Sequence, residues 1–179
     1  MTIQVSKNYN FDHIFVIRNP YGEAPLTALA LFQTSEPCAV RVTVKGDHET
    51  EDYTSEVPPA RLHRVPILAL YAGRDNIVQL QLLDKNGGLL RERTILVPTK
   101  NLPSYLRDLI DIKKMSKDPA FKNILISGGL DINTCAFDRT GQIRYYLRRP
   151  VKGYGVFPLA GGRFYFMEKR VSRPTYTNP

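Results

Sequence analysis

The 179-residue sequence contains few residues that could form covalent or metal cross-links. It has two cysteines, Cys38 and Cys135, and three histidines, His13, His48 and His63. A disulfide framework requires more cysteines, and a structural metal site requires about four ligands. We therefore expect two free thiols and no metal site.

Long apolar runs are also missing. No stretch approaches the roughly 20 apolar residues that cross a bilayer, so we expect no membrane partner. Residues 1–10 have one lysine and no continuous apolar segment, so no secretory signal peptide is visible and the compartment stays open. The composition, 42% hydrophobic and 23% charged, is that of an ordinary globular protein.

The basic excess is spread along the chain. The formal net charge is +8, but lysines and arginines run from Lys7 to Arg173 with acidic residues between them. The densest stretch, residues 144–152, holds four basic residues. A dispersed pattern is typical of a solvated surface, so we expect no nucleic-acid partner.

Short apolar segments with polar connections predict β-strands in the first half. The valines of residues 39–45 alternate with polar residues, which is the period of a half-buried strand. Residues 26–32 are also apolar, and the turn-like residues 34–37 predict a hairpin between these two segments. Residues 65–71 predict a third strand, and residues 77–97 predict a hairpin around Lys-Asn-Gly-Gly.

These strands predict an all-β protein that opens with an antiparallel, immunoglobulin-like β-sandwich domain over residues 1–98. Residues 99–120 are expected to form a linker. Within it, five apolar residues follow the spacing of one helical face and predict a short helix between Asn101 and Met115. These are Leu102, Tyr105, Leu106, Leu109 and Ile110.

Residues 121–179 return to strand patterns with glycine punctuation. Residues 121–127, 134–138, 142–147 and 163–168 are apolar segments, and Asp138 to Gly141 has the chemistry of a tight turn. This rhythm predicts the first blade of an incomplete β-propeller. A lone blade cannot bury both faces, so we expect this part to be less protected than the sandwich.

Three segments resemble one known family, the bacterial arylsulfate sulfotransferases. They are NPYGEAPLTAL at Asn19–Leu29, ISGGLDINTCAFDRTGQIRYYL at Ile126–Leu147, and PLAGGRFYF at Pro158–Phe166. The first segment resembles the opening of that family's N-terminal sandwich domain. The other two resemble its first propeller blade, although FDxxGxI also occurs in unrelated propellers.

The resemblance implies a six-bladed propeller enzyme, exported or periplasmic, with a homodimer as its assembly. Such an enzyme moves a sulfuryl group from a phenolic sulfate donor to a phenol acceptor through a sulfohistidine, without a cofactor. The family's catalytic residues come from later blades, and His13, His48 and His63 match none of them. We therefore assign no catalytic, cofactor-binding or metal-binding residue, and expect this stretch alone to be inactive. The alternative is a non-enzymatic β-sandwich module for binding or assembly.

Two histidine neighbourhoods could bind ions. His48 lies in the acidic segment 46–52, which could hold a cation, although a solvated loop is the favoured interpretation. His63 has Arg61 and Arg64 beside it, and this cluster could receive a sulfate or a carboxylate. A polar strand start is the favoured interpretation there.

Two groups in the second half could contact ligands. Asp131 and Asn133 could line the mouth of a propeller, although capping of a glycine bend is favoured. The stretch from Arg144 to Arg149 interleaves basic residues with Tyr145 and Tyr146, a composition that stacks on phenols or bases. Strand alternation pairs Tyr145 with Leu147 and Tyr146 with Arg148, so packing within the blade is favoured.

Overall fold

The computed structural model describes residues 5–6, 8–107, 110–112, 125–127, 135–148, 153–159 and 163–168. This part of the chain is all-β, with two three-residue 3-10 turns, Glu49–Glu51 and Ser104–Leu106, and no α-helix. Within the same residues, no helix has the length and apolarity needed to cross a membrane.

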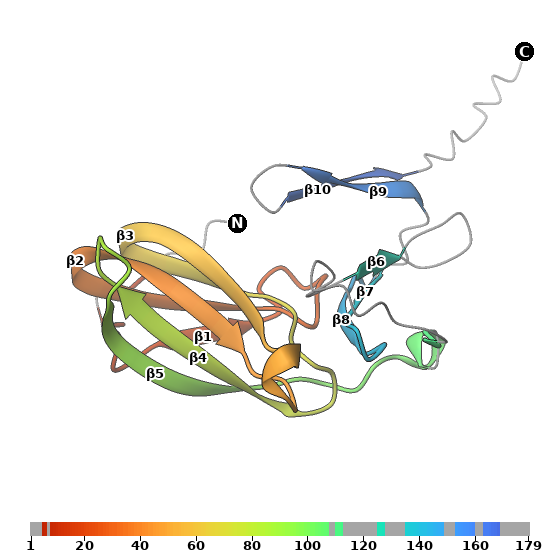
Figure 1. The fold of residues 1–179 in the computed structure, drawn as a ribbon, viewed down its shortest axis with the longest axis horizontal. Coiled ribbons are helices and arrows are strands. Elements are labelled where there is room, and N and C mark those ends of the chain that lie inside the picture. The colour runs from red at the N-terminus through yellow and green to blue at the C-terminus, as the bar shows by residue number, and fades with distance from the viewer. Residues whose placement is uncertain are drawn as a thin grey trace, which may run out of the picture.

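A five-stranded antiparallel sheet forms the first part of the protein. Strand β2 pairs with β3 along one edge, and along the other edge with β1 and then β4, which in turn pairs with β5. Figure 1 shows this sheet curling into two layers, with β3 over one side and β4 and β5 along the other. The strands are β1 (Phe15–Arg18), β2 (Ala28–Val44), β3 (Tyr53–Ile67), β4 (Asp75–Leu83) and β5 (Leu89–Pro98).

The hairpin expected between residues 26–32 and 39–45 is wrong. Both segments belong to the single 17-residue strand β2, whose register shifts between Gln33 and Cys38. The Thr34 hydroxyl donates a hydrogen bond of 2.8 Å to the Glu36 carbonyl oxygen, which stabilises a bulge rather than a reversal. Because a bulge bends its strand, β2 can contribute to both layers of the sandwich.

Strand β3 is longer than the sequence predicted. It begins at Tyr53 rather than near Val65, and it contains Pro58, Pro59 and Pro66. Among the described strands, β3 pairs only with β2, so it is an edge strand. Proline lacks an N–H, and an edge strand tolerates this because one side of its backbone forms no ladder bonds.

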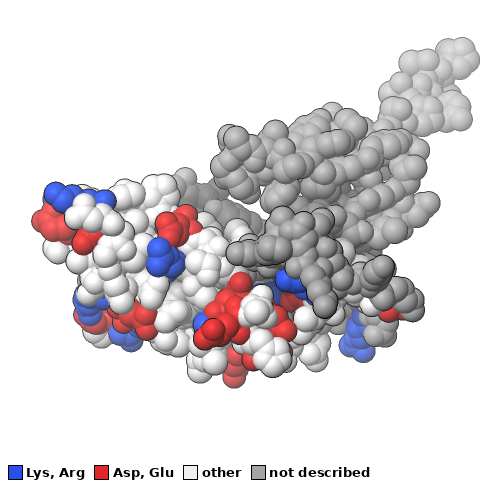
Figure 2. All heavy atoms as spheres, viewed as in Figure 1, with Lys and Arg blue, Asp and Glu red and all other residues white. Residues whose placement is uncertain are grey.

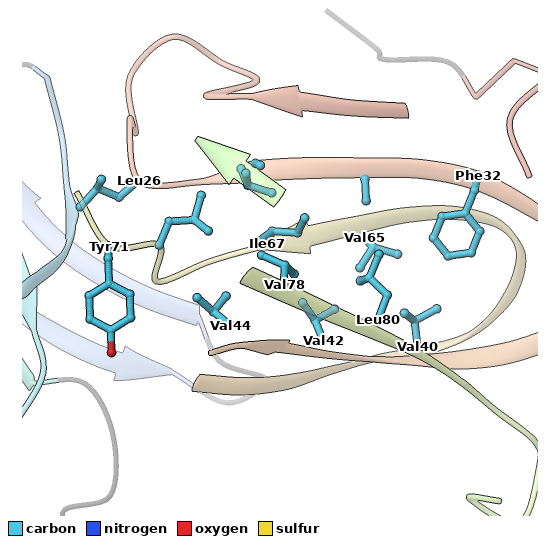
Figure 3. Close-up of a cluster of buried hydrophobic side chains, with 14 of the residues drawn as sticks. Leu26, Phe32, Val40, Val42, Val44, Val65, Ile67, Tyr71, Val78 and Leu80 are labelled. Carbon is cyan, nitrogen blue, oxygen red and sulfur yellow. The ribbon is translucent and has the colours of Figure 1, made fainter. Parts of the chain in front are cut away.

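The core of the sandwich lies between the two layers of the curled sheet. Val40, Val42 and Val44 of β2 are at most 1% exposed, so the alternation expected for this segment is confirmed. Figure 3 shows these valines facing side chains of β3 and β4, with Phe32 at one end of the row and Tyr71 at the other. Burying each such aliphatic side chain contributes about 1.5–3 kcal/mol.

The hairpin predicted within residues 77–97 is confirmed by the pairing of β4 with β5. Its turn is organised by Asp84, whose Oδ1 accepts the backbone N–H of Asn86 at 2.7 Å and of Gly88 at 2.8 Å. Gly87 has a φ of +82°, which glycine adopts without steric cost.

The short helix expected after Asn101 is reduced to the 3-10 turn Ser104–Leu106, and residues 110–112 are not helical. Leu106 is 1% exposed in the core, and Leu102 and Ile110 pack against that core. Tyr105 is instead exposed. In the described part of the linker, Leu102, Leu106 and Ile110 therefore contact the core cluster without forming a continuous helical face, and Leu109 lies outside the described residues.

Two further β-structures follow the linker. Strands β6 (Leu125–Ser127), β7 (Cys135–Phe137) and β8 (Ile143–Tyr146) form a three-stranded antiparallel sheet, and β9 (Gly153–Leu159) pairs with β10 (Arg163–Glu168).

The turn expected between β7 and β8 is confirmed. The Gly141 N–H donates to the Asp138 carbonyl oxygen at 3.0 Å, and Gly141 has a φ of +86°. Three buried side chains of this sheet join the same hydrophobic cluster as the sandwich core. The sheet therefore has the packing neighbours that a lone blade was expected to lack. The three are Cys135, Ile143 and Tyr146.

Candidate functional site

Two of the four carboxylates in the acidic loop at residues 46–52 pair with basic side chains of the protein. Asp52 forms an ion pair with Lys45 and accepts the Gly46 N–H at 2.9 Å, and Asp47 lies 2.6 Å from an Arg74 nitrogen. His48 is exposed. Among the described residues, no group of three or more His, Cys, Asp and Glu could hold a metal ion. The favoured interpretation, a solvated loop, agrees with this arrangement.

The cluster around His63 does not converge on an anion. His63 is 1% exposed in the middle of β3, so it is not at a strand start. Arg61 and Arg64 are exposed instead, and Arg61 pairs with Glu36 at 3.2 Å. His63 therefore lies in the core while both arginines lie at the surface, and for Arg64 this follows from strand alternation, which turns the neighbour of an inward side chain outward.

Inside the sandwich, His63 is part of a small polar network. Its Nε2 lies 2.9 Å from Thr34 Oγ1 and 3.7 Å from Cys38 Sγ, and its ring stacks on Phe32 at 4.5 Å. The Thr34 hydroxyl donates its one proton to Glu36, so His63 Nε2 must be the donor toward Thr34. His63 Nδ1, which has no partner, is then an unprotonated acceptor.

Burial lowers the pKa of His63 below its ordinary value of 6.5. Protonation would place an unpaired N–H and a charge in the core, and both would be desolvated. The network therefore holds a neutral imidazole. Both thiols are free, as expected, and burial raises the pKa of Cys135.

The most buried cation in the described structure is Arg144, on β8. It is 1% exposed, and its Nη1 lies 2.9 Å from Asp138 Oδ2. Its Nε and Nη2 donate to the carbonyl oxygen of Ala69, at 2.9 and 2.7 Å. All three guanidinium nitrogens therefore bond to the protein, so Arg144 is not available to bind an external sulfuryl or phosphoryl group.

The Tyr71 ring lies between two guanidinium groups. The Arg144 guanidinium carbon is 3.4 Å from the ring centroid, and that of Arg74 is 3.6 Å from it. Burial raises the pKa of Tyr71, while the charge of Arg144 opposes that change. Tyr71 is held by Asn76, whose Oδ1 accepts the Tyr71 N–H at 2.7 Å and whose Nδ2 donates to the Tyr71 carbonyl oxygen at 3.0 Å.

The sequence analysis missed this arrangement around Arg144. Alternation along β8 places Arg144 on the same face as Tyr146, which is 6% exposed. Packing within the blade was the favoured interpretation for the tyrosines, and Tyr146 is instead buried in the cluster shared with the sandwich core. The aromatic residue on this face was the available signal that Arg144 also points inward. Tyr145 is partly buried, whereas Asp131, Asn133 and Arg149 lie outside the described residues.

A second contact joins the sandwich to β8 through the Asn-Pro-Tyr-Gly turn. Asn19 has a φ of +46°, and its Oδ1 accepts the Ala24 N–H at 2.9 Å. This turn leads to Glu23, whose carbonyl oxygen accepts the Arg148 N–H at 2.8 Å. These hydrogen bonds give the turn a structural role.

Comparison with known protein families identifies the sandwich. Residues 15–99 match the family model described as the arylsulfotransferase Ig-like domain. Residues 15–99 belong to that family. The match begins at the first residue of β1 and ends one residue after β5, so it covers the five-stranded sheet. No curated protein matches the chain.

Two histidines of the chain, His48 and His63, lie in the Ig-like domain and His13 lies just before it, and the structure does not bring the three together. His13 is exposed beside Asn10, His48 is exposed on the acidic loop, and His63 is buried in the core. Figure 2 shows acidic and basic side chains beside one another toward the left of the face in view, and a group of acidic side chains near its lower centre. The described part of the domain thus presents paired charges and a packed core, without a cluster of nucleophiles and acid–base groups.

Proposed function

We propose that this chain is the N-terminal portion of an arylsulfate sulfotransferase. The full enzyme transfers a sulfuryl group from a phenolic sulfate ester to a phenol acceptor through a sulfohistidine. The observation that supports this proposal is the match of residues 15–99 to the arylsulfotransferase Ig-like domain. Strands β6–β10 are proposed to be the first part of a β-propeller whose later blades supply the catalytic histidine and the groups that bind the sulfuryl oxygens.

The chemistry requires more than the described residues provide. A sulfuryl group in transit carries negative charge on its oxygens, so it needs a nucleophile and cationic donors within hydrogen-bond distance. His63 of the Ig-like domain lacks access to solvent, and the nitrogens of the buried Arg144 on β8 are bonded to Ala69 and Asp138. The domain is proposed to support the enzyme structurally.

The test compares the 179-residue chain with the product of the whole reading frame. Both are incubated with 4-nitrophenyl sulfate and an excess of phenol, and release of 4-nitrophenolate is followed at 400 nm, a wavelength at which that ion absorbs. We expect turnover by the whole product and none by the 179-residue chain. Turnover by this chain alone would contradict the assignment of catalysis to later blades.

A labelling experiment locates the intermediate. The whole product is treated with ³⁵S-labelled donor without acceptor, digested, and mapped by mass spectrometry. We expect label on a histidine other than His13, His48 and His63. Matched variants His13→Asn and His48→Asn should keep full activity, and loss of activity in either would assign that exposed histidine a part in catalysis.

A second candidate function is assembly, with another copy of the chain as partner. Strand β5 pairs only with β4 among the described strands, and it carries Leu90 and Leu96, which are 56% and 63% exposed. Ile77 of β4 lies opposite Leu96 in the ladder and is 49% exposed. Exposed apolar side chains on an edge strand are a surface that proteins often cover with a partner.

Sedimentation equilibrium tests this assembly role. A dimer formed through β4 and β5 should dissociate in Leu96→Lys, but not in the matched variant Leu62→Lys, which changes an exposed leucine on the opposite edge strand β3. A monomer at all concentrations would contradict the assembly role and would leave the enzymatic proposal untouched.

A further inference from the structure

We propose that Arg144 locks the Ig-like domain to the sheet β6–β7–β8. Three residues complete this latch: Ala69 and Tyr71 of the Ig-like domain, and Asp138 of the β7–β8 turn. We infer that the latch makes the two parts open as one cooperative unit, so that the domain fixes the orientation of the following sheet.

The receiving side of the latch is built entirely within the Ig-like domain. Ala69 has a φ of +59°, a left-handed conformation that residues with a side chain seldom adopt. The Ala69 carbonyl oxygen accepts both Arg144 bonds. The segment is held after this point by Asn76 and by Thr99, whose hydroxyl donates to the Tyr71 carbonyl oxygen at 2.6 Å. A strained backbone held by its surroundings in this way commonly marks a site with a specific task.

The inserting side is equally organised. Asp138 Oδ1 accepts the backbone N–H of Thr140 at 2.9 Å and of Gln142 at 3.1 Å, which forms the β7–β8 turn. Its other oxygen, Oδ2, accepts from Arg144 at 2.9 Å. One carboxylate therefore shapes the turn and orients the guanidinium that enters the Ig-like domain.

A state in which Arg144 is buried but keeps only some of its partners is unfavourable. Arg144 is 1% exposed and Asp138 is 5% exposed, so both have given up their hydration. A buried charge that loses one partner is strongly destabilised, because the remaining groups cannot replace it. Arg144 is therefore stable with all its partners or fully withdrawn into water, and this favours two states without intermediates.

Further contacts also join the Ig-like domain to the sheet β6–β7–β8. The Arg148 N–H bonds to Glu23 of the Ig-like domain, and Ile143 and Tyr146 join the hydrophobic cluster that includes Leu106. These contacts are individually ordinary. Only Arg144 combines full burial, a charge and a forked contact with one carbonyl oxygen, so we assign the locking role to it.

Native-state hydrogen exchange of the 179-residue chain tests the latch, because it measures the opening of each strand separately. In the natural sequence we expect the most protected amides of β7 and β8 to exchange at rates matched to those of β2 and β4. In Arg144→Met, amides of β7 and β8 should exchange faster by on the order of a hundredfold, while those of β2 and β4 change much less. Arg144→Lys keeps the charge but lacks the guanidinium that makes two hydrogen bonds to one carbonyl oxygen. The difference in exchange rate between the two sets of amides should therefore be smaller than in Arg144→Met.

The matched control is Arg74→Met. It removes the other guanidinium from the Tyr71 ring, but the bonds of Arg74 stay within the Ig-like domain. This variant should keep the two sets of amides matched. Unequal protection in the natural sequence, or matched protection in Arg144→Met, would overturn the proposal. A difference in exchange rate between the two sets of amides that is as large in Arg74→Met as in Arg144→Met would also overturn the proposal.

Discussion

A basic side chain is buried at each end of the Ig-like core, in the neutral form at one end and in the charged form at the other. At the end near Phe32, His63 is buried as a neutral ring that keeps one nitrogen without a partner. At the end near Tyr71, Arg144 is buried as a cation with a partner for every guanidinium nitrogen. Figure 3 shows these two aromatic residues at opposite ends of the same row of aliphatic side chains.

The difference follows from the chemistry of the two groups. An imidazole can lose its proton near neutral pH, so a buried histidine avoids the cost of an unpaired charge by becoming neutral. A guanidinium keeps its proton at all ordinary pH values, so a buried arginine must bring its counter-charge with it. The His63 end should therefore be sensitive to pH, and the Arg144 end should be sensitive to loss of partners.

Asp138→Asn should destabilise the protein most, because it leaves a buried cation without its counter-charge. The amide oxygen can still accept the turn N–H groups, so the main loss is electrostatic. We expect the free energy of unfolding, measured with urea, to fall by about 3–5 kcal/mol.

Asp84→Asn is the matched control for this change. Asp84 also accepts two backbone N–H groups through Oδ1, but in the exposed β4–β5 turn. Its loss should be below about 1 kcal/mol, because solvent screens the charge. Equal losses in Asp84→Asn and Asp138→Asn would mean that both carboxylates act only through their turns.

At the neutral end, the largest expected effect comes from Thr34→Val. This change keeps the shape of the side chain but leaves His63 Nε2–H and the Cys38 thiol without their acceptor. We expect a loss of about 1–3 kcal/mol in the free energy of unfolding, measured by urea titration. Thr94→Val, on exposed β5, is the control and should be near neutral; a larger loss there would indicate that β-strand propensity, rather than the network, decides the result.

Most strands of the sheet could be predicted from the sequence, but the bulge that bends β2 could not. The alternation of Val40, Val42 and Val44 predicted a buried face because period-two patterning is read directly from the chain. The Thr-Ser-Glu-Pro segment was interpreted as a turn, yet it forms a bulge within β2. Turns and bulges use the same residue types, and only the partner strand β3 decides between them.

The latch was not predictable in the same way. Arg144 and Ala69 are 75 residues apart, and nothing in the chemistry of an alanine indicates that its carbonyl oxygen binds a guanidinium. Residue type also favours an exposed arginine, so the tertiary contact overrides the usual preference. The absence of an assigned catalytic residue stays a prediction.

A pH titration tests whether the neutral form of His63 contributes to stability. Burial lowers the pKa of His63 in the folded protein, so the unfolded chain binds more protons between that lowered value and about 6.5. Stability is therefore fully present above about pH 6.5 and falls as the pH decreases toward the folded-state pKa. The effect should be smaller than that of Thr34→Val, because no hydrogen-bond partner is removed.

Urea unfolding at several pH values in this window provides the measurement. In His63→Gln, the amide can still donate to Thr34 but does not titrate, so the dependence on pH should flatten. Arg144→Lys should keep the slope, since neither side chain changes charge in this range. A slope that persists unchanged in His63→Gln would assign the pH dependence to other groups.

Glu56→Gln should have the least effect on stability, because it removes an exposed ion pair rather than a buried one. Arg41 and Glu56 lie 2.8 Å apart across β2 and β3, with side chains that are 39% and 54% exposed. This distance nearly equals the 2.9 Å between Arg144 and Asp138, so the two pairs differ mainly in burial. Because water screens the exposed pair and solvates either partner alone, Glu56→Gln should change the free energy of unfolding by about 0–1 kcal/mol. A loss as large as that of Asp138→Asn would show that distance, rather than desolvation, sets the strength of ion pairs in this fold.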